Sequence, residues 1–130
     1  MFTRAHHVAL IVKDYNTSKD FYTRILGIPV IRETYRKERD SYKLDLQLDN
    51  GLQLELFSFP NPPPRPSRPE ASGLRHLAFA VRNLDEAIQH LLECGVEVEP
   101  VRVDELTGQR FTFFADPDKL PLELYEQRAK

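Results

Sequence analysis

Two histidines, each opening an apolar segment, are the residues of this chain with the clearest potential for chemistry. His7 and His76 begin eight-residue segments that are similar in residue type at every position. Glu55 follows the first histidine at nearly the spacing at which Glu123 follows the second. Imidazole nitrogens and carboxylate oxygens are ligands for Zn, Ni, Co, Mn or Fe(II). The repeated pair therefore predicts a site for one divalent metal ion.

Neither residue type alone supports this interpretation. A single histidine at the start of a strand is more often a core or rim residue, and a single strand glutamate more often faces solvent. Both types at matching positions of two copies are not expected from independent placement, which favours the metal site. No thiolate accompanies the four ligands, so we expect an octahedral catalytic centre with two open positions rather than a closed structural zinc site. Such a centre can polarise a carbonyl while a neighbouring carboxylate moves a proton.

The elements that position these residues recur in the same order in each half. A strand beginning near the histidine leads to a helix, and three strands follow, the last of which carries the glutamate. The helices end at Gly27 and Gly95, and the second begins with a capping pair, Asn83 and Glu86. The predicted strands are residues 5–13, 28–36, 41–48 and 52–58 in the first half, and 75–82, 96–103, 109–115 and 120–126 in the second. The pattern predicts an α+β fold of two βαβββ modules.

Three local features sharpen this prediction. Residues 5–13 carry apolar side chains on both alternating faces, which predicts a strand buried on both sides. Asn50-Gly51 predicts a type I′ hairpin turn, because this pair accepts positive φ. Pro121 would interrupt a ladder in mid-strand, so we expect it at the start of its strand.

A proline-rich tract separates the two copies. Six prolines fall within residues 60–69, and such a segment is stiff, extended and excluded from sheet ladders. A linker between modules explains its position better than a ligand for an SH3-type domain. We therefore expect one domain, residues 1–130, with module one at 1–58, the linker at 59–73 and module two at 74–130.

Strand alternation decides which side chains share a face. Glu55 alternates with leucines along its strand, and Glu123 does the same in the last strand. The leucine face must receive the helix of each module, so both glutamates should point to the opposite side of the sheet. Residues 41–48 show the same alternation of leucine with polar residues. A charged mid-strand residue on a half-buried face is costly unless it is paired or bound to metal.

Composition limits the remaining function classes. The 130 residues suit one domain with a real core, and 41% hydrophobic content is ordinary for a globular protein. A net charge of −2 gives no reason to expect nucleic acid or membrane partners. The N-terminal residues contain no long apolar run, so neither a signal peptide nor a membrane span is predicted, and cytoplasm is the expected location. Cys94 is expected to be a buried thiol, and His6 and His90 to be structural or surface residues.

These residues resemble the vicinal oxygen chelate (VOC) superfamily, which includes glyoxalase I, fosfomycin-resistance proteins and extradiol dioxygenases. The resemblance covers nearly the whole chain and is closest to the small bacterial glyoxalase-like proteins of the YaeR type. Its motifs are the segment from His7 to Asp14, Phe21-Tyr22, Leu26-Gly27, Glu55-Leu-Phe-Ser-Phe-Pro, Arg65-Pro-Ser-Arg-Pro-Glu-Ala, Arg75-His76-Leu-Ala-Phe, Asp116-Pro117-Asp118 and Glu123-Leu-Tyr-Glu.

The resemblance implies paired modules that form a curved mixed sheet around a metal-binding cavity. His7, Glu55, His76 and Glu123 fall on the four ligand positions of glyoxalase I, a lyase that isomerises the adduct of a 2-oxoaldehyde and a thiol. There, one glutamate would take the C–H proton and return it to the adjacent carbon, while the metal stabilises an enediolate. Lys119 departs from the glycine that often completes the Asp-Pro-Asp turn, and no residues match those that hold glutathione.

Two other classes of function remain open. An Fe(II) dioxygenase or thiol transferase on the same scaffold would use His7, His76 and Glu123 alone. A non-catalytic binding or resistance protein would bind a small molecule without turnover. The resemblance also implies a homodimer, in which each site is built either within one chain or across two. A small-molecule substrate, potentially anionic, could be received by arginines: Arg36, Arg39, Arg65, Arg68, Arg75 and Arg110.

Overall fold

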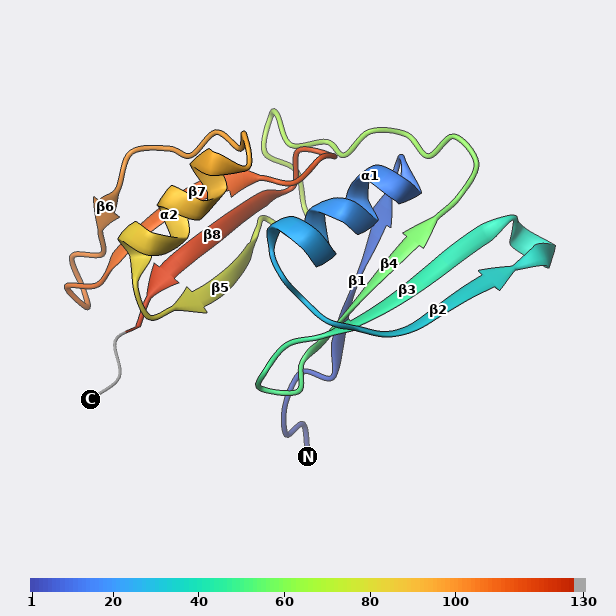
Figure 1. Ribbon diagram of the computed structural model, residues 1–130, viewed down its shortest axis with the longest axis horizontal. Coiled ribbons are helices and arrows are strands. Elements are labelled where there is room, and N and C mark those ends of the chain that lie inside the picture. The colour runs from blue at the N-terminus through green and yellow to red at the C-terminus, as the bar shows by residue number, and fades with distance from the viewer. Residues whose placement is uncertain (128–130) are drawn as a thin grey trace. The chain divides into compact units, whose positions relative to one another are not determined.

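A computed structural model describes residues 1–127, and the chain divides into two units, Met1–Pro64 and Arg65–Lys130. Each unit contains one four-stranded sheet and the element order βαβββ, which confirms the predicted α+β fold of two tandem modules (Figure 1). The boundary between the units falls within the predicted linker 59–73. Among the described residues, no helix is long and apolar enough to cross a membrane.

The first unit has β1 and β4 side by side and parallel, with β3 and then β2 added in antiparallel fashion. Its elements are β1 (His7–Val12), α1 (Tyr15–Asp20), β2 (Val30–Arg36), β3 (Ser41–Gln47) and β4 (Gln53–Ser58). A π-helical turn, Phe21–Ile25, extends α1, and a short 3₁₀ turn, Lys37–Arg39, joins β2 to β3. The parallel pairing of β1 with β4 aligns the strand that begins with the first histidine beside the strand that carries Glu55.

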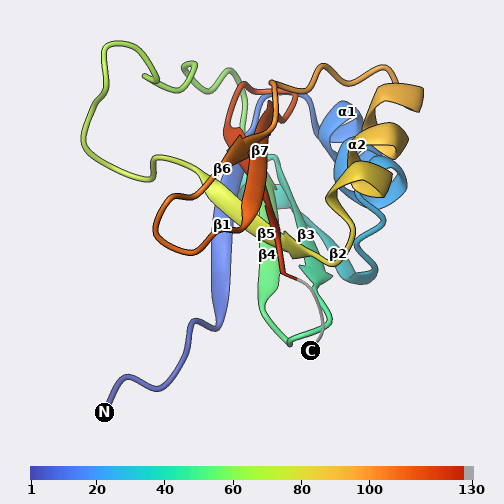
Figure 2. The same ribbon diagram turned by 90° about the vertical axis from the view of Figure 1, so that its left-hand side faces the viewer.

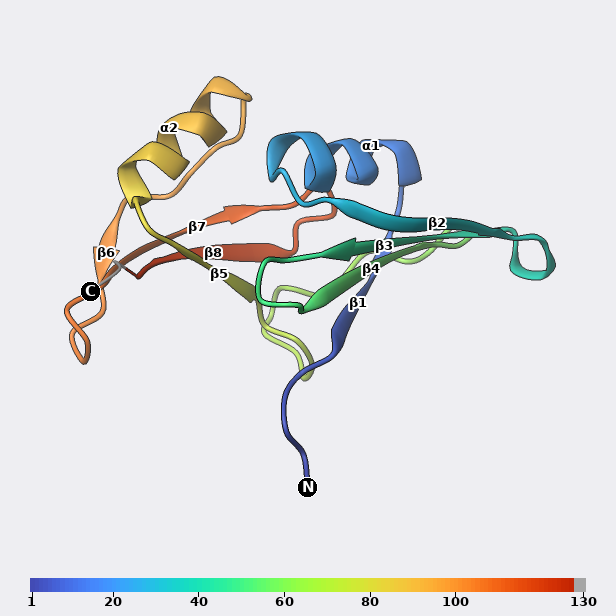
Figure 3. The same cartoon turned by 60° about the horizontal axis from the view of Figure 1, so that its bottom comes forward.

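The core of the first unit lies between α1 and one face of this sheet (Figure 3). Four leucines of β3 and β4 are fully buried there: Leu44, Leu46, Leu54 and Leu56. The prediction that the first strand is buried on both sides is wrong, because Leu10 and Val12 are buried whereas His7, Ala9 and Ile11 are exposed. Its apolar residues at both alternating positions concealed this one-sided burial.

The second unit repeats the sheet order as β5-β8-β7-β6, with β5 parallel to β8. Its elements are β5 (Leu77–Val81), α2 (Leu84–Glu93), β6 (Arg102–Val103), β7 (Arg110–Ala115) and β8 (Pro121–Glu126). Pro121 stands at the start of its strand, as predicted. The predicted strand 96–103 is reduced to two residues, Arg102 and Val103. In the segment that precedes these two residues, the Glu99 carbonyl accepts the hydroxyl of Thr112 at 2.6 Å.

Three turns show how the sequence fixes local geometry. Asn83 accepts the backbone N–H of Glu86 at 3.0 Å, which confirms the predicted cap of the second helix. The type I′ prediction is wrong, because that turn needs positive φ at both Asn50 and Gly51 and only Gly51 has it. The Leu48 N–H instead donates to the Leu52 carbonyl across a three-residue loop. Lys119 adopts a left-handed φ of 67° after the Asp-Pro-Asp sequence, so the turn keeps the conformation usually given to glycine.

The connector between β4 and β5, residues 59–76, carries no helix or strand (Figure 2). Its proline content removes backbone donors and fixes φ, which explains why it joins neither sheet. Arg65 ties the connector together by donating to the Ser67 hydroxyl at 2.6 Å and to the Leu74 carbonyl at 2.9 Å. These contacts link its proline-rich stretch to the residues that precede β5.

Candidate metal-binding residues

The first unit brings the first predicted pair together. Parallel pairing of β1 with β4 sets Glu55 opposite Ala9, two residues beyond His7. His7 Nδ1 lies 3.7 Å from the Glu55 carboxylate. The glutamate side chain is only 11% exposed although it faces away from the leucine core, and the histidine ring is 45% exposed. A carboxylate this poorly solvated needs a cationic or hydrogen-bonding partner.

Two further charged residues accompany Glu55. Asp45 stands directly opposite Glu55 in the antiparallel pairing of β3 with β4, and its side chain is 6% exposed. Lys43 Nζ reaches 3.5 Å from the Asp45 carboxylate and 3.9 Å from that of Glu55. Sequence reasoning assigned neither residue to the site. The alternation of residues 41–48 already set them on the glutamate face, which was the available signal.

His6, expected to be structural or a surface residue, contacts the first candidate ligand directly. Its Nδ1 lies 2.9 Å from Nδ1 of His7, and the two rings meet edge to face with centroids 5.1 Å apart. One nitrogen of such a pair must donate and the other accept. His6 therefore orients the His7 ring, which is the role that the neighbours of metal-binding histidines commonly have.

The second unit brings the other predicted pair together more tightly. His76 Nε2 lies 3.0 Å from Glu123 Oε1, and Glu123 stands opposite Ala78 in the parallel pairing of β5 with β8. The histidine side chain is 31% exposed and the glutamate 11%. Phe113 occupies the position across from Glu123, and its ring packs edge to face against His76 at 5.1 Å. An aromatic wall thus replaces the charged residues of the first unit.

Each unit supplies one of the two predicted His–Glu pairs. Within residues 1–127, neither unit brings three His, Cys, Asp or Glu side chains close enough to hold a metal ion. Each predicted pair offers one imidazole and one poorly solvated carboxylate, which fit a borderline or hard divalent ion. A four-ligand site would require both pairs, so the complete ligand set remains a prediction.

Sequence comparison decides the family. The sequence model of the Glyoxalase/Bleomycin resistance protein/Dioxygenase superfamily matches residues 4–124. The chain belongs to this superfamily. The resemblance to VOC proteins inferred from the motifs is thereby confirmed.

Close relatives of this VOC protein match it along nearly its whole length. YwkD of Bacillus subtilis (strain 168) is 65% identical over 122 residues, which cover 94% of this chain and 95% of that protein. YaeR of Escherichia coli (strain K12) is 58% identical over 124 residues, covering 95% and 96%. The crystal structure of a glyoxalase family protein from Enterococcus faecalis superposes with a TM-score of 0.89 at 51% identity, covering 96% of this chain and 98% of that one.

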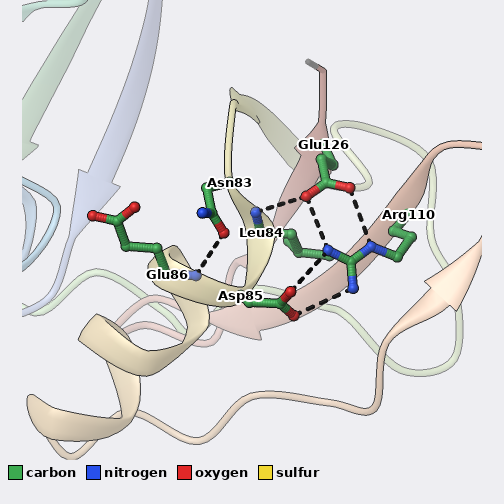
Figure 4. Close-up of polar contacts among 6 residues, drawn as sticks. All are labelled: Asn83, Leu84, Asp85, Glu86, Arg110 and Glu126. Atoms are coloured by element: carbon green, nitrogen blue, oxygen red, sulfur yellow. Dashed lines mark hydrogen bonds and ion pairs between the residues drawn. The ribbon is translucent and has the colours of Figure 1, made fainter.

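Arg110, considered above as an anion receptor, is committed to the start of α2 in this VOC protein (Figure 4). Its guanidinium donates to Glu126 at 3.0 and 3.1 Å and to Asp85 at 3.1 and 3.2 Å. These bonds, first to Glu126 and then to Asp85, raise the pKa of Arg110 above its ordinary value. Glu126 is 3% exposed and also accepts the backbone N–H of Leu84 at 2.9 Å. Arg110 is therefore a structural residue.

Two arginines of the first unit stack on aromatic rings. The Arg36 guanidinium carbon lies 4.8 Å from the ring centre of Phe57, and that of Arg39 lies 4.9 Å from the ring centre of Phe59. Such cation–π contacts hold the guanidinium plane against the ring and leave its edge for other partners. Arg36 also donates to the Ser41 hydroxyl at 2.9 Å. Both arginines thus support the aromatic end of β4.

Proposed function

We propose that the chain is a divalent-metal-dependent lyase or isomerase of the glyoxalase I type. Its substrate would be a small oxygen-bearing molecule such as the thiol adduct of a 2-oxoaldehyde. The observation that carries the proposal is the recurrence of one His–Glu contact at equivalent register positions in both units, His7 with Glu55 and His76 with Glu123. Structural residues under no functional constraint would not need to repeat this costly pairing of a poorly solvated carboxylate.

These four residues would hold the metal through two imidazole nitrogens and two carboxylates. When bound, the ion would act as a Lewis acid toward the oxygens of the substrate. A fosfomycin resistance protein from Listeria monocytogenes that shares this fold (TM-score 0.76, 24% identity) was solved in complex with Mn(II). That likeness concerns the fold alone, and it makes a divalent ion compatible with this architecture.

The chain's own residues would carry the proton transfer. A carboxylate oxygen of Glu55 or of Glu123 would accept the C–H proton next to the substrate carbonyl and return it to the neighbouring carbon. His7 and His76 would orient these carboxylates through the contacts already made. The low exposure of the two carboxylates, 11% in each case, would keep bulk water from competing for the proton.

A second candidate within the same chemistry is epimerisation at a carbon next to a carbonyl. A 2-epi-5-epi-valiolone epimerase from an Actinomyces species is 30% identical over 140 residues, which cover 92% of this chain and 76% of that protein. Inversion at one carbon needs one carboxylate to take the proton and the other to return a proton to the opposite face, with the same activated carbonyl. The two candidates differ in whether the proton returns to the neighbouring carbon or to its original one.

The partner in the assembly would be a second copy of this chain. Each site needs one His–Glu pair from each kind of module, and these come either from one chain or from two chains of a homodimer. Mixing Glu55→Gln with Glu123→Gln protein distinguishes the two arrangements. If sites are shared across a dimer, the randomised mixture should regain about one quarter of the wild-type activity. About half of its dimers are then heterodimers, and one of the two sites in each heterodimer is intact. A site within one chain regains none.

The test of function is turnover by purified protein of known metal content. The purified chain would be analysed for bound elements, stripped with EDTA and reloaded with Zn, Ni, Co, Mn or Fe(II). Each form would be offered the adduct of methylglyoxal with glutathione and with other small thiols. We expect metal-dependent isomerisation that Glu55→Gln and Glu123→Gln each reduce by about 10²- to 10⁴-fold with the fold retained.

The other outcomes identify the alternatives. Oxygen-dependent ring cleavage with Fe(II), or thiol transfer, would replace the isomerase by another reaction of the superfamily. Inversion at a carbon without isomerisation would favour the epimerase. Tight binding of a small molecule with no turnover by any metal form would make the chain a non-catalytic binding protein.

A further inference from the structure

A pocket of about 440 Å³ lies within the second unit, beside the second His–Glu pair. Its volume is in the range of small-molecule sites. One wall is the connector from Arg65 to Arg75, and the other is made by His76 and the sheet residues Arg102 and Phe113. The candidate ligand His76 therefore lines the same space, so a molecule in the pocket would abut it.

The charge of this pocket is opposite to that of the whole chain. Four arginines and two glutamates line it: Arg65, Arg68, Arg75, Arg102, Glu70 and Glu99. The chain as a whole carries a net charge of −2. A concave surface with an excess of guanidinium groups raises the local concentration of anions.

The arginines of the pocket differ in whether they already have partners within the protein. Arg68 pairs with Glu70 at 3.2 Å. Arg102 donates a hydrogen bond from one guanidinium nitrogen to the Glu99 carboxylate at 2.6 Å, and its guanidinium carbon lies 5.7 Å from the ring centre of Phe113. Arg75 alone among the pocket's arginines has no hydrogen bond or ion pair with any residue in the described range 1–127. It is exposed and directly precedes His76 in the chain.

We propose that this pocket receives an anionic group of the substrate, a carboxylate or a phosphate-type oxyanion, with Arg75 as its principal binding residue. The proposal rests on the proposed function and names the substrate class of that site. A guanidinium with no internal partner can offer two parallel N–H donors to such a group. The Arg102 charge is paired with Glu99, and Phe113 offers an apolar surface to the carbon skeleton. An anion held by Arg75 would set the rest of the molecule beside His76.

Binding of simple anions to the metal-free, full-length chain tests the proposal without turnover. The EDTA-treated protein would be titrated with inorganic phosphate and, separately, with acetate at low ionic strength, where screening is weak. Amide chemical shifts would report saturation. We expect saturable binding that Arg75→Gln weakens about tenfold, which corresponds to about 1.4 kcal/mol. Arg75→Lys should keep part of the affinity, because it retains the charge and loses the bidentate geometry.

The matched control is Arg82→Gln, which removes the same charge from an exposed position of the second unit outside the pocket. Its phosphate affinity should equal that of the wild type. Tighter binding of phosphate would assign a phosphate-type substrate, and tighter binding of acetate a carboxylate, and either supports the proposal. Absence of saturable binding, or equal affinities for Arg75→Gln and Arg82→Gln, would overturn it. Because no metal or reaction enters this test, its failure is distinct from failure of the proposed catalysis.

Discussion

The two His–Glu pairs occupy equivalent backbone positions in surroundings of opposite character. In each unit the glutamate stands across from an alanine of the parallel strand, Ala9 or Ala78. Its antiparallel neighbour is Asp45 in the first unit and Phe113 in the second. Strand register thus fixes where the carboxylate lies, and a single cross-strand residue decides whether it meets charge or an aromatic ring.

The histidine rings differ in the same way. His6 contacts the ring of His7, which is 45% exposed and 3.7 Å from its glutamate. Phe113 contacts the ring of His76, which is 31% exposed and only 3.0 Å from its glutamate. Both rings make an edge-to-face contact at 5.1 Å, so the His–Glu distance and the exposure of the ring are what distinguish the two pairs. The second pair is therefore the better preorganised of the two.

The largest expected effect tests whether both pairs serve one metal. We expect Glu55→Gln and Glu123→Gln each to lower divalent-metal affinity by more than about 100-fold, the upper end of what loss of a supporting hydrogen bond costs. Competition with a chromogenic chelator would measure the affinities. Glu97→Gln, at an exposed position of the second unit, is the charge-matched control and should retain wild-type affinity.

An unequal result would break the symmetry between the pairs. Should Glu55→Gln keep nearly full affinity while Glu123→Gln loses it, the ligand set would be His7, His76 and Glu123. That set would favour the dioxygenase or transferase alternative. Retention of affinity by both variants would remove the metal site altogether.

The strand ends give the next largest contrast. Glu126, the last residue of β8, is buried and accepts hydrogen bonds from both Arg110 and the Leu84 N–H. At the equivalent end of β4, Ser58 accepts the Tyr42 N–H at 2.9 Å and no other hydrogen bond within residues 1–127. Glu126→Ala should lower the free energy of unfolding by about 2–3 kcal/mol, because it leaves a buried donor and a cation without their acceptor. Ser58→Ala should cost about 0.5–1 kcal/mol.

Urea denaturation followed by circular dichroism would measure both losses. Glu126→Gln serves as the intermediate variant, since its amide oxygen can still accept the Leu84 N–H while the charge is gone. Equal losses for Glu126→Ala and Ser58→Ala would mean that the carboxylate contributes no more than an ordinary exposed hydrogen bond.

Periodicity in the sequence correctly predicted the face of the sheet on which each glutamate lies. Alternation in residues 52–58 and 120–126 assigned Glu55 and Glu123 to the face opposite the leucines, and the repeat assigned a histidine to each. The same alternation could not show that the face of β1 bearing His7 would be exposed, because apolar residues filled both of its faces. Burial there depends on what packs against the strand, which is a tertiary property.

Other features escaped prediction because they depend on irregular backbone. Residues 96–101 have apolar alternation, yet the strand is reduced to Arg102–Val103, although the Glu99 N–H still donates to the Phe113 carbonyl of β7. The pocket beside His76 is formed largely by the connector, whose conformation no periodic pattern specifies. Arg102 was consequently absent from the predicted anion receptors. Arg110 was included among them because its partners Asp85 and Glu126 lie 25 and 16 residues away, a separation at which the sequence does not reveal the contact.

A smaller effect concerns Lys43, the cation beside the first pair. Lys43→Met removes the positive charge shared by Asp45 and Glu55, and Phe111 takes the corresponding position in the second unit. The lysine is 31% exposed, so solvent screening limits the expected loss of metal-free stability to about 1 kcal/mol. The affinity for a divalent ion should rise about threefold, because a competing cation is gone.

Calorimetric titration of the EDTA-treated protein would measure this rise. The matched control is Lys37→Met, a lysine in the 3₁₀ turn between β2 and β3. An unchanged or weaker affinity in Lys43→Met would show that Lys43 supports the carboxylate geometry more than it competes for the charge.

The smallest expected effect compares one hydrogen-bonded carboxylate in each unit as the pH falls. The pKa of Glu33 is lowered by hydrogen bonds from Lys19 and then Tyr15, and that of Asp104 by the Leu106 N–H and then the Tyr125 hydroxyl. A carboxyl whose folded pKa is depressed stabilises the protein above its unfolded pKa of about 4, and this contribution disappears as pH falls through the folded value.

Glu33→Gln and Asp104→Asn should therefore be less stable than wild type at pH 6, and the difference should vanish towards pH 2. Urea midpoints measured across this range would show it. Because the two carboxylates lie in separate units with no shared partner, the two losses should add in the double variant. Tyr125→Phe, which removes one donor to Asp104, should reproduce part of the Asp104→Asn effect. A difference that persisted at the same size down to pH 2 would mean that each variant acts through packing and not through the charge.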